Sequence, residues 1–149
     1  MNIEELRKAL IRDEGLRLAA YLDPEGILTV GIGHNCIASP VAGVTKPGDR
    51  ITEELAYQLF DADIGETIKQ LDRTLPWWRG LDSPRQNVLL NMGFNMGVPK
   101  LSKFVKTLQA IQREDYEAAA DEMLESRWAA QVGNRALRLA QAMEEGTFV

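Results

Sequence analysis

One long helix, predicted over residues 51–75, constrains the fold of this chain more than any other feature of its sequence. Thr52 is a suitable N-cap, and the acidic residues Glu53 and Glu54 suit the positive end of a helix dipole. An apolar stripe at helical spacing follows: Phe60, Ile64, Ile68, Leu71 and Leu75. Pro76 then ends the helix. At 1.5 Å per residue, about 23 residues span roughly 35 Å, so this helix is long enough to connect two lobes.

The residues before this helix predict a short helix and a β-hairpin. Asn2 is a candidate N-cap for a helix over residues 2–13. Residues 16–22 alternate with the period of two that is typical of a strand, and residues 27–32 are apolar and rich in β-forming side chains. Between them, the Asp-Pro-Glu-Gly sequence at 23–26 has a turn-favouring residue at every position. We therefore expect a small antiparallel hairpin.

The chain beyond residue 76 is predicted to be helical throughout. The Ser83-Pro84-Arg85-Gln86 sequence has the pattern of a capping box with proline in the first turn, and it opens a segment that continues to Met96. Further helices are expected at about residues 100–112, 114–125, 126–131 and 134–145.

These elements predict an α+β fold, mainly α, in a single domain over residues 1–149. The small N-terminal lobe, at about residues 13–60, contains the β-hairpin or a short sheet. The helical C-terminal lobe combines residues 76–149 with the helix at 2–12. The helix over residues 51–75 connects the two lobes.

Composition and charge argue against several classes of function. The chain has 17 Lys and Arg against 22 Asp and Glu, and no third of it forms a basic patch, so nucleic-acid binding is not expected. The single cysteine, Cys36, excludes an intrachain disulfide, and one cysteine with one histidine argues against a zinc cluster, so no metal is expected. No apolar run approaches the roughly 20 residues of a membrane span, so stable membrane insertion is not expected. The N-terminus also lacks a signal-peptide pattern.

Two acidic residues occupy positions that suit acid and base chemistry. Glu14 lies four residues after Leu10 and three after Ile11, so it continues the apolar stripe of the first helix. Loss of water there and the negative potential of the helix C-terminus both favour the protonated form, which a general acid needs. Asp23 begins a turn, where it is better hydrated and expected to be ionised. Two acids in such different environments are typical of an acid and base pair.

Thr29 is a third candidate, because it lies on the return strand three residues after Gly26. Its hydroxyl is suited to orient a water between the hairpin and Glu14. Each of the three residues also has an ordinary structural explanation: a solvated helix end, a turn former and a β-branched strand residue. Spacing by itself leaves both interpretations open.

Three segments resemble the signatures of one family. The run DEGLRLAAYLDPEGILTVGIGH, residues 13–34, is similar to the N-terminal signature of the T-even phage lysozymes, which are glycoside hydrolases that cleave bacterial cell walls. NMGFNMG at 91–97 and SRWAAQVGNRA at 126–136 resemble two further signatures, in the same order. The resemblance covers nearly the whole chain. It implies a lysozyme-like fold whose substrate cleft lies between the two lobes.

The resemblance implies a role for each of the three candidates. Glu14 would be the proton donor, while Asp23 and Thr29 would position and activate a water on the opposite face of the sugar. The implied reaction is hydrolysis, without metal or cofactor, of the β-1,4 bond between N-acetylmuramic acid and N-acetylglucosamine in peptidoglycan. Such a single displacement inverts the anomeric centre and needs carboxyls roughly 6.5–9.5 Å apart, whereas retention needs about 5–5.5 Å.

The resemblance also implies binding and structural residues. Three substrate contacts are expected: Asn35, Phe94 and Thr107. His34 is a candidate general base, but we favour an ion pair with Asp63 on the long helix. Glu25 and Arg127 are expected to form a similar pair.

The implied partner is the glycan strand of peptidoglycan, and a monomer is expected. A phage lysin without a signal would remain in the host bacterial cytoplasm until it is released to the cell wall. Two alternatives stay open. A lytic transglycosylase forms a 1,6-anhydro sugar without water and does not need Asp23. A non-catalytic wall-binding phage module has no need of an acid on an apolar stripe.

Overall fold

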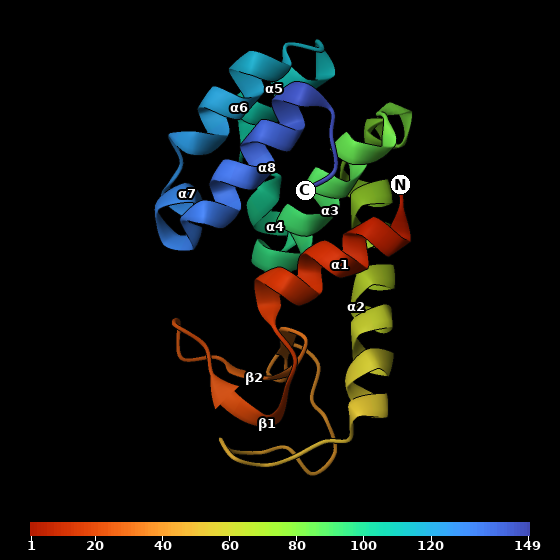
Figure 1. The fold of residues 1–149 in the computed structure, drawn as a ribbon, viewed down its shortest axis with the longest axis vertical. Coiled ribbons are helices and arrows are strands. Elements are labelled where there is room, and N and C mark those ends of the chain that lie inside the picture. The colour runs from red at the N-terminus through yellow and green to blue at the C-terminus, as the bar shows by residue number, and fades with distance from the viewer. The chain divides into compact units, whose positions relative to one another are not determined.

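The computed structural model describes all of residues 1–149, which form two compact units. Residues 10–66 form one unit, which we term the β unit, and residues 1–9 with 67–149 form the other, the helical unit. Helices α1 (Ile3–Glu14) and α2 (Glu53–Thr74) contribute to both units, because the boundary crosses each of them (Figure 1). No helix combines the length and the apolar character that a membrane span requires.

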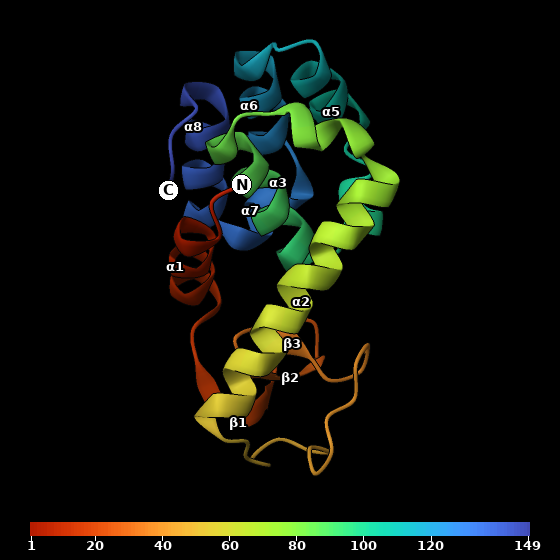
Figure 2. The same cartoon turned by 90° about the vertical axis from the view of Figure 1, so that its right-hand side faces the viewer.

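The β unit contains a three-stranded antiparallel sheet in the order β1, β2, β3 (Figure 2). The strands are β1 (Arg17–Leu22), β2 (Leu28–Gly31) and β3 (His34–Asn35). The predicted hairpin is confirmed, with its turn between β1 and β2. The third strand was not predicted, because two residues are too few to show a period of two.

The first strand is bulged in its middle. Arg17 pairs with Gly31 and Tyr21 pairs with Thr29. Tyr21 is four positions after Arg17, whereas Thr29 is only two positions before Gly31, so β1 is the longer side between these pairs. A bulge of this kind bends the strand and redirects its side chains.

The backbone that the bulge releases from β2 pairs with the segment 48–51. The Ile51 N–H donates to the Leu18 carbonyl at 2.9 Å, and the Ala20 N–H donates to the Asp49 carbonyl at 2.7 Å. The bulged backbone is therefore hydrogen-bonded on its other side, and the bulge is a fixed part of the fold.

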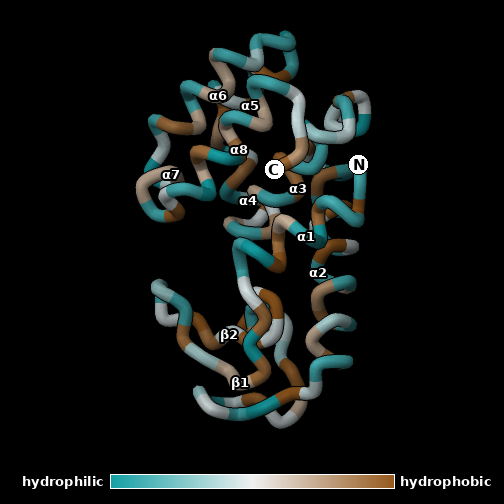
Figure 3. The backbone as a smooth tube through the Cα atoms, in the orientation of Figure 1, coloured by the Kyte–Doolittle hydropathy of each residue, from teal (hydrophilic) through white to brown (hydrophobic).

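The core of the β unit is built from the strands, the loop after them and the start of α2. Its buried members are Ala20, Leu28, Val30, Cys36, Val44, Ile51 and Ala56. Hydrophobic and hydrophilic segments alternate along α2, as its helical period requires (Figure 3). The predicted stripe is buried at Phe60, Ile64, Leu71 and Leu75 and half-buried at Ile68.

In the helical unit, α3 (Ser83–Met96) is the most deeply placed helix along residues 86 to 93, all eight of which are buried. A 3-10 helix at Pro76–Gly80 follows α2. The other helices are α4 (Val98–Leu101), α5 (Val105–Gln112), α6 (Tyr116–Leu124), α7 (Arg127–Val132) and α8 (Asn134–Glu145). The mainly helical α+β fold expected from the sequence is confirmed.

Two details of the predicted helices are wrong. The N-cap of α3 is Asp82 rather than Ser83, because the Asp82 carboxylate accepts from the Arg85 backbone N–H at 3.3 Å. The segment 100–112 is not one helix, since α4 ends at Leu101 and α5 begins four residues later. The Ser102 hydroxyl donates to the Pro99 carbonyl at 2.6 Å and so satisfies a backbone acceptor where α4 ends.

Arg85 joins three helices of this unit. Its guanidinium lies over the Tyr116 ring of α6, 3.5 Å from the ring centroid. Its Nε donates to the Met143 carbonyl at 2.6 Å, and its Nη2 donates to the Glu144 carbonyl at 2.9 Å. These bonds satisfy carbonyls at the C-terminus of α8, which have no partner within the helix. A Cβ atom at Gly146 would lie 2.9 Å from Arg85 Nη1, so a side chain there would displace the guanidinium.

We expect Arg85→Met to lower the free energy of unfolding by about 2 kcal/mol, because it keeps the aliphatic stem but removes the donors to the α8 carbonyls. Denaturation by urea measures the change. Lys69→Met, which removes an exposed positive charge from α2, is the control and should change stability by less than about 0.5 kcal/mol. Equal losses in the two variants would contradict this role of Arg85.

Candidate active site

Glu14 is the last residue of α1, and its half-buried carboxyl lies directly against Gly33. A Cβ atom added to Gly33 would lie 2.9 Å from Glu14 Oε2 and 3.0 Å from Glu14 Cδ. Gly33 also has a φ of +64°, which side-chain-bearing residues rarely adopt. The Gly-Ile-Gly-His segment therefore needs glycine at this position, and the backbone there forms one wall around the Glu14 carboxyl.

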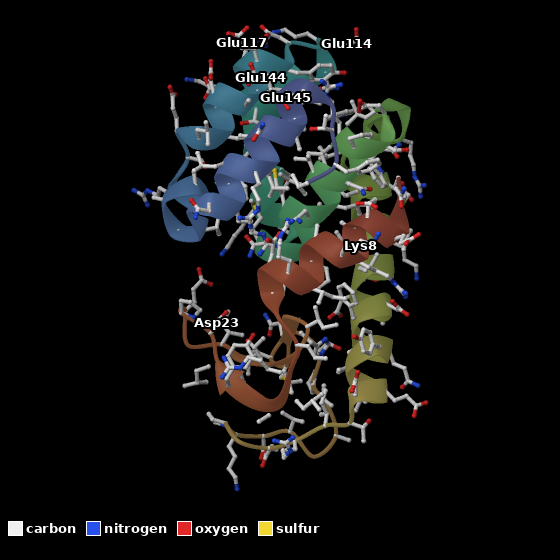
Figure 4. The ribbon with its side chains drawn as sticks, viewed as in Figure 1. Lys8, Asp23, Glu114, Glu117, Glu144 and Glu145 are labelled. Carbon is white, nitrogen blue, oxygen red and sulfur yellow. The ribbon has the colours of Figure 1, made fainter.

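Asp23 begins the turn between β1 and β2, where Figure 4 labels it. Its Oδ1 accepts from the backbone N–H groups of Glu25 and Ile27, each at 2.8 Å. Its own N–H donates to the Ile27 carbonyl at 3.0 Å. One carboxylate oxygen is thus occupied in fixing the side chain to the turn, while Oδ2 accepts no hydrogen bond from the protein.

Thr29 lies on β2 and is 5% exposed. Its hydroxyl donates to the Ile27 carbonyl at 2.8 Å, so its proton is engaged and the oxygen can act only as an acceptor toward a further molecule. The Ile27 peptide groups therefore bond to both candidates: the N–H to Asp23 and the carbonyl to Thr29. The structure brings these two side chains together at one backbone residue.

Tyr21 is a member of the site that the sequence analysis did not identify. It pairs across the sheet with Thr29, and directly paired residues place their side chains on the same face. Burial raises the pKa of Tyr21, and the negative charges of Glu14 and Asp23 raise it further. Both carboxyls therefore lie close enough to the Tyr21 phenol to influence its ionisation. A tyrosine in a strand is common, and only its position two residues before Asp23 could have indicated a role.

His34 and Asp63 are in contact, as the family resemblance implied. His34 is 2% exposed, and its Nδ1 donates to Asp63 Oδ2 at 2.7 Å. Its Nε2 donates to the Ser39 carbonyl at 2.8 Å. Since a carbonyl and a carboxylate both accept, both ring nitrogens are suited to carry protons, and the imidazolium is favoured. The hydrogen bond to Asp63 is the main cause that raises the pKa of His34, and burial opposes it. This histidine is poorly suited to act as a base.

Asn35 is exposed and fixes the turn that follows β3. Its Oδ1 accepts from the backbone N–H groups of Ile37 and Ala38, each at 2.9 Å. The side-chain oxygen is thus engaged in the turn, and the amide nitrogen is the group suited to a substrate. No group of three or more His, Cys, Asp or Glu side chains is arranged to hold a metal ion.

The remaining expected residues belong to the helical unit. Phe94 is half-buried on α3, and Thr107 on α5 is 3% exposed. Arg127 is exposed at the start of α7, whereas its expected partner Glu25 belongs to the β unit. The substrate contacts and the Glu25–Arg127 pair stay predictions.

Comparison with known proteins identifies the family of this chain. The family model described as phage lysozyme matches residues 12–143. The chain is 30% identical to the probable T4-type lysozyme 2 of Dictyostelium discoideum, over 98% of this chain and 97% of that protein. It is 32% identical to the endolysin of Salmonella phage P22, over 77% of this chain and 75% of that protein.

A further relative is much longer than this chain. The pre-baseplate central spike protein Gp5 of Enterobacteria phage T4 is 34% identical over 96% of this chain, but the match covers only 28% of the spike protein. The rest of that protein has no counterpart in these 149 residues.

We expect the contribution of the His34 and Asp63 pair to stability to fall as pH rises. The folded-state pKa of His34 lies above its ordinary value of 6.5, so the contribution is complete below about pH 6.5 and is lost as pH rises through the raised value. Asp63→Asn keeps an acceptor but removes the charge, and should cost about 1.5–3 kcal/mol at pH 5.5 and distinctly less at pH 9.

Urea denaturation at the two pH values measures this difference. Asp61→Asn changes an exposed acid on the same helix and should not show the same decline. A cost of Asp63→Asn that is the same at pH 5.5 and pH 9 would show that the pair does not depend on the histidine charge.

Proposed function

This chain belongs to the phage lysozyme family and is a glycoside hydrolase of peptidoglycan, and we propose that Glu14, Asp23 and Thr29 carry out its reaction. The bond cleaved is the β-1,4 linkage between N-acetylmuramic acid and N-acetylglucosamine. The observation that carries the proposal is the arrangement in the β unit. One carboxyl lies against the backbone of Gly33, and a second acid and a hydroxyl are both fixed to Ile27.

Glu14 is the general acid in this proposal. The Gly33 backbone blocks one side of its carboxyl, which limits the directions in which the group can present a proton. When the glycosidic bond breaks, Glu14 transfers its proton to the departing sugar oxygen. A correctly placed general acid typically contributes a factor of about 10² to 10⁴ in rate.

Asp23 and Thr29 hold the attacking water. Asp23 Oδ2 and the Thr29 hydroxyl oxygen are both acceptors, because Oδ1 and the hydroxyl proton are already engaged. A water that donates one proton to each keeps a lone pair to attack the anomeric carbon. The new carbon–oxygen bond forms as the glycosidic bond breaks, and Asp23 takes the proton that the water loses. Such a single displacement inverts the anomeric centre.

The other expected roles are part of the same proposal. Asn35, Phe94 and Thr107 contact the sugars, and Glu25 pairs with Arg127. The chain works as a monomer and a single domain over residues 1–149. It waits in the host cytoplasm until it is released to the wall.

We expect Glu14→Gln to lower the rate of wall cleavage by at least about 100-fold, because the amide keeps the shape but has no acidic proton to give. The release of new reducing ends from purified peptidoglycan measures this rate. Glu54→Gln, which neutralises an exposed acid at the start of α2, is the matched control and should retain its activity. Undiminished cleavage by Glu14→Gln would rule out the assigned acid.

The same digest separates the proposed reaction from its alternatives. Hydrolysis gives a reducing end whose initial anomer is inverted, which proton NMR detects before mutarotation. A lytic transglycosylase would give a 1,6-anhydro end instead, and a wall-binding module would give no new ends.

We expect Gly33→Ala to reduce kcat by roughly 100-fold, because the new methyl group displaces the Glu14 carboxyl, and a shift of about 1 Å in a catalytic group can cost that much. Gly43→Ala is a matched control. Gly43 has a φ of +80°, but a Cβ atom there would meet nothing within 4 Å. Both variants should lose a similar stability from backbone strain, measured by thermal unfolding, while only Gly33→Ala loses activity. Equal kcat values in the two variants would show that the contact with Glu14 has no catalytic effect.

A further inference from the structure

Arg17, at the start of β1, holds its guanidinium over the ring of Tyr21, 3.7 Å from the ring centroid. In a regular strand, the Cα atoms of residues four apart are separated by roughly 13 Å, so two side chains meet over that distance only when both lean toward each other. The contact here spans the bulge, which lies between Arg17 and Tyr21. The residues at the two ends of the bulge are therefore in direct side-chain contact.

The stacked guanidinium has no carboxylate partner in the protein. None of the ion pairs or hydrogen bonds of the structure engages the Arg17 side chain, although the residue is exposed and its strand leads into the turn that Asp23 begins. Stacking uses the flat face of a guanidinium and leaves its N–H edge available for hydrogen bonds. Arg17 is thus a fixed positive charge with unused donors.

This charge lies within the electrostatic surroundings of the proposed active site. The positive charge of Arg17 lowers the pKa of Tyr21, whereas the negative charges of Glu14 and Asp23 raise it. The chain as a whole has a net charge of −5, which does not attract an anionic polymer over long range. A single positively charged group beside the acids is where an anionic substrate gains most from a local contact.

We propose that Arg17, held by Tyr21, is a binding subsite for a carboxylate of the peptidoglycan substrate. The proposal rests on the proposed function and adds a contact outside the reacting bond. The planar N–H fork of arginine matches the two oxygens of a carboxylate. Tyr21 is a positioning residue for Arg17, because its ring fixes the guanidinium before the substrate arrives.

Peptidoglycan offers such carboxylates from two sources. Stem peptides end in or carry free carboxylates, and the lactyl group of N-acetylmuramic acid is a carboxylate wherever its peptide has been removed. Three substrates separate the sources: intact walls, walls whose carboxyls have been converted to neutral amides, and peptide-free glycan strands.

The test compares Arg17→Gln with Arg50→Gln, a matched control that removes the same charge from another exposed arginine of the β unit. We expect Arg17→Gln to raise KM for intact walls by about tenfold while kcat changes little, as expected for a lost charged hydrogen bond. The Arg50→Gln variant should behave as the wild type. On amidated walls, Arg17→Gln and the wild type should have the same KM. A defect on peptide-free strands assigns the lactyl carboxylate, and its absence there assigns the stem peptide.

Two tyrosine variants test the positioning role. The quantity compared is KM on amidated walls divided by KM on intact walls. Tyr21→Phe keeps the ring, so this ratio should equal that of the wild type. Tyr21→Leu removes the ring, so the ratio should fall to the value for Arg17→Gln. Thermal unfolding checks that each variant is folded, and sedimentation with intact and amidated walls measures binding independently of cleavage.

Several results would overturn the subsite. These are a KM of Arg17→Gln equal to that of the wild type on intact walls, an equal defect on amidated walls, or the same defect in Arg50→Gln. A wild-type protein that cleaves no wall would contradict the proposed function instead, and sedimentation would then still decide whether Arg17 binds a carboxylate.

Discussion

The contact between the Glu14 carboxyl and the backbone at Gly33 is the constraint on which the proposed site depends. It joins the C-terminal end of α1 to the turn between β2 and β3, and it leaves no space for a side chain at position 33. The next residue, His34, is fixed by Asp63 of α2 and by the Ser39 carbonyl. The partly buried ion pair therefore stabilises the turn that confines the acid, and it contributes both to stability and to the geometry of the site.

The other side of the site is held by backbone hydrogen bonds. Asp23 and Thr29 lie six residues apart along the chain, yet both are bonded to Ile27. Each bond uses one hydrogen-bonding group of a side chain and leaves another available. Asp23 keeps one carboxylate oxygen, and Thr29 keeps only its capacity to accept. Engagement with the backbone thus specifies what each side chain can do to a water, at little cost in freedom when the water binds.

The bulge in β1 lies at the proposed carboxylate subsite. Arg17 and Tyr21 lie at the two ends of the bulge, and their side chains stack on each other. The segment 48–51 satisfies the backbone groups that the bulge would otherwise expose. In the helical unit, Arg85 has a similar relation to its surroundings, because its guanidinium stacks on Tyr116 while its donors satisfy the end of α8. The donors of Arg85 are engaged by the protein, whereas those of Arg17 remain available.

Local sequence determined much of this protein. The Asp-Pro-Glu-Gly turn, the Asn2 cap and the apolar stripe of α2 act over a few residues, so their periodicity and chemistry predict the hairpin and the helices. The run at 13–34 indicates Glu14, Asp23 and Thr29 through its resemblance to a family. Only the tertiary structure decided the bulge, the stack of Arg17 on Tyr21, the break between α4 and α5, and the contact of Glu14 with Gly33. These features depend on pairing between segments distant along the chain, and hydrophobic period and turn chemistry carry no information about which distant backbone a residue will meet.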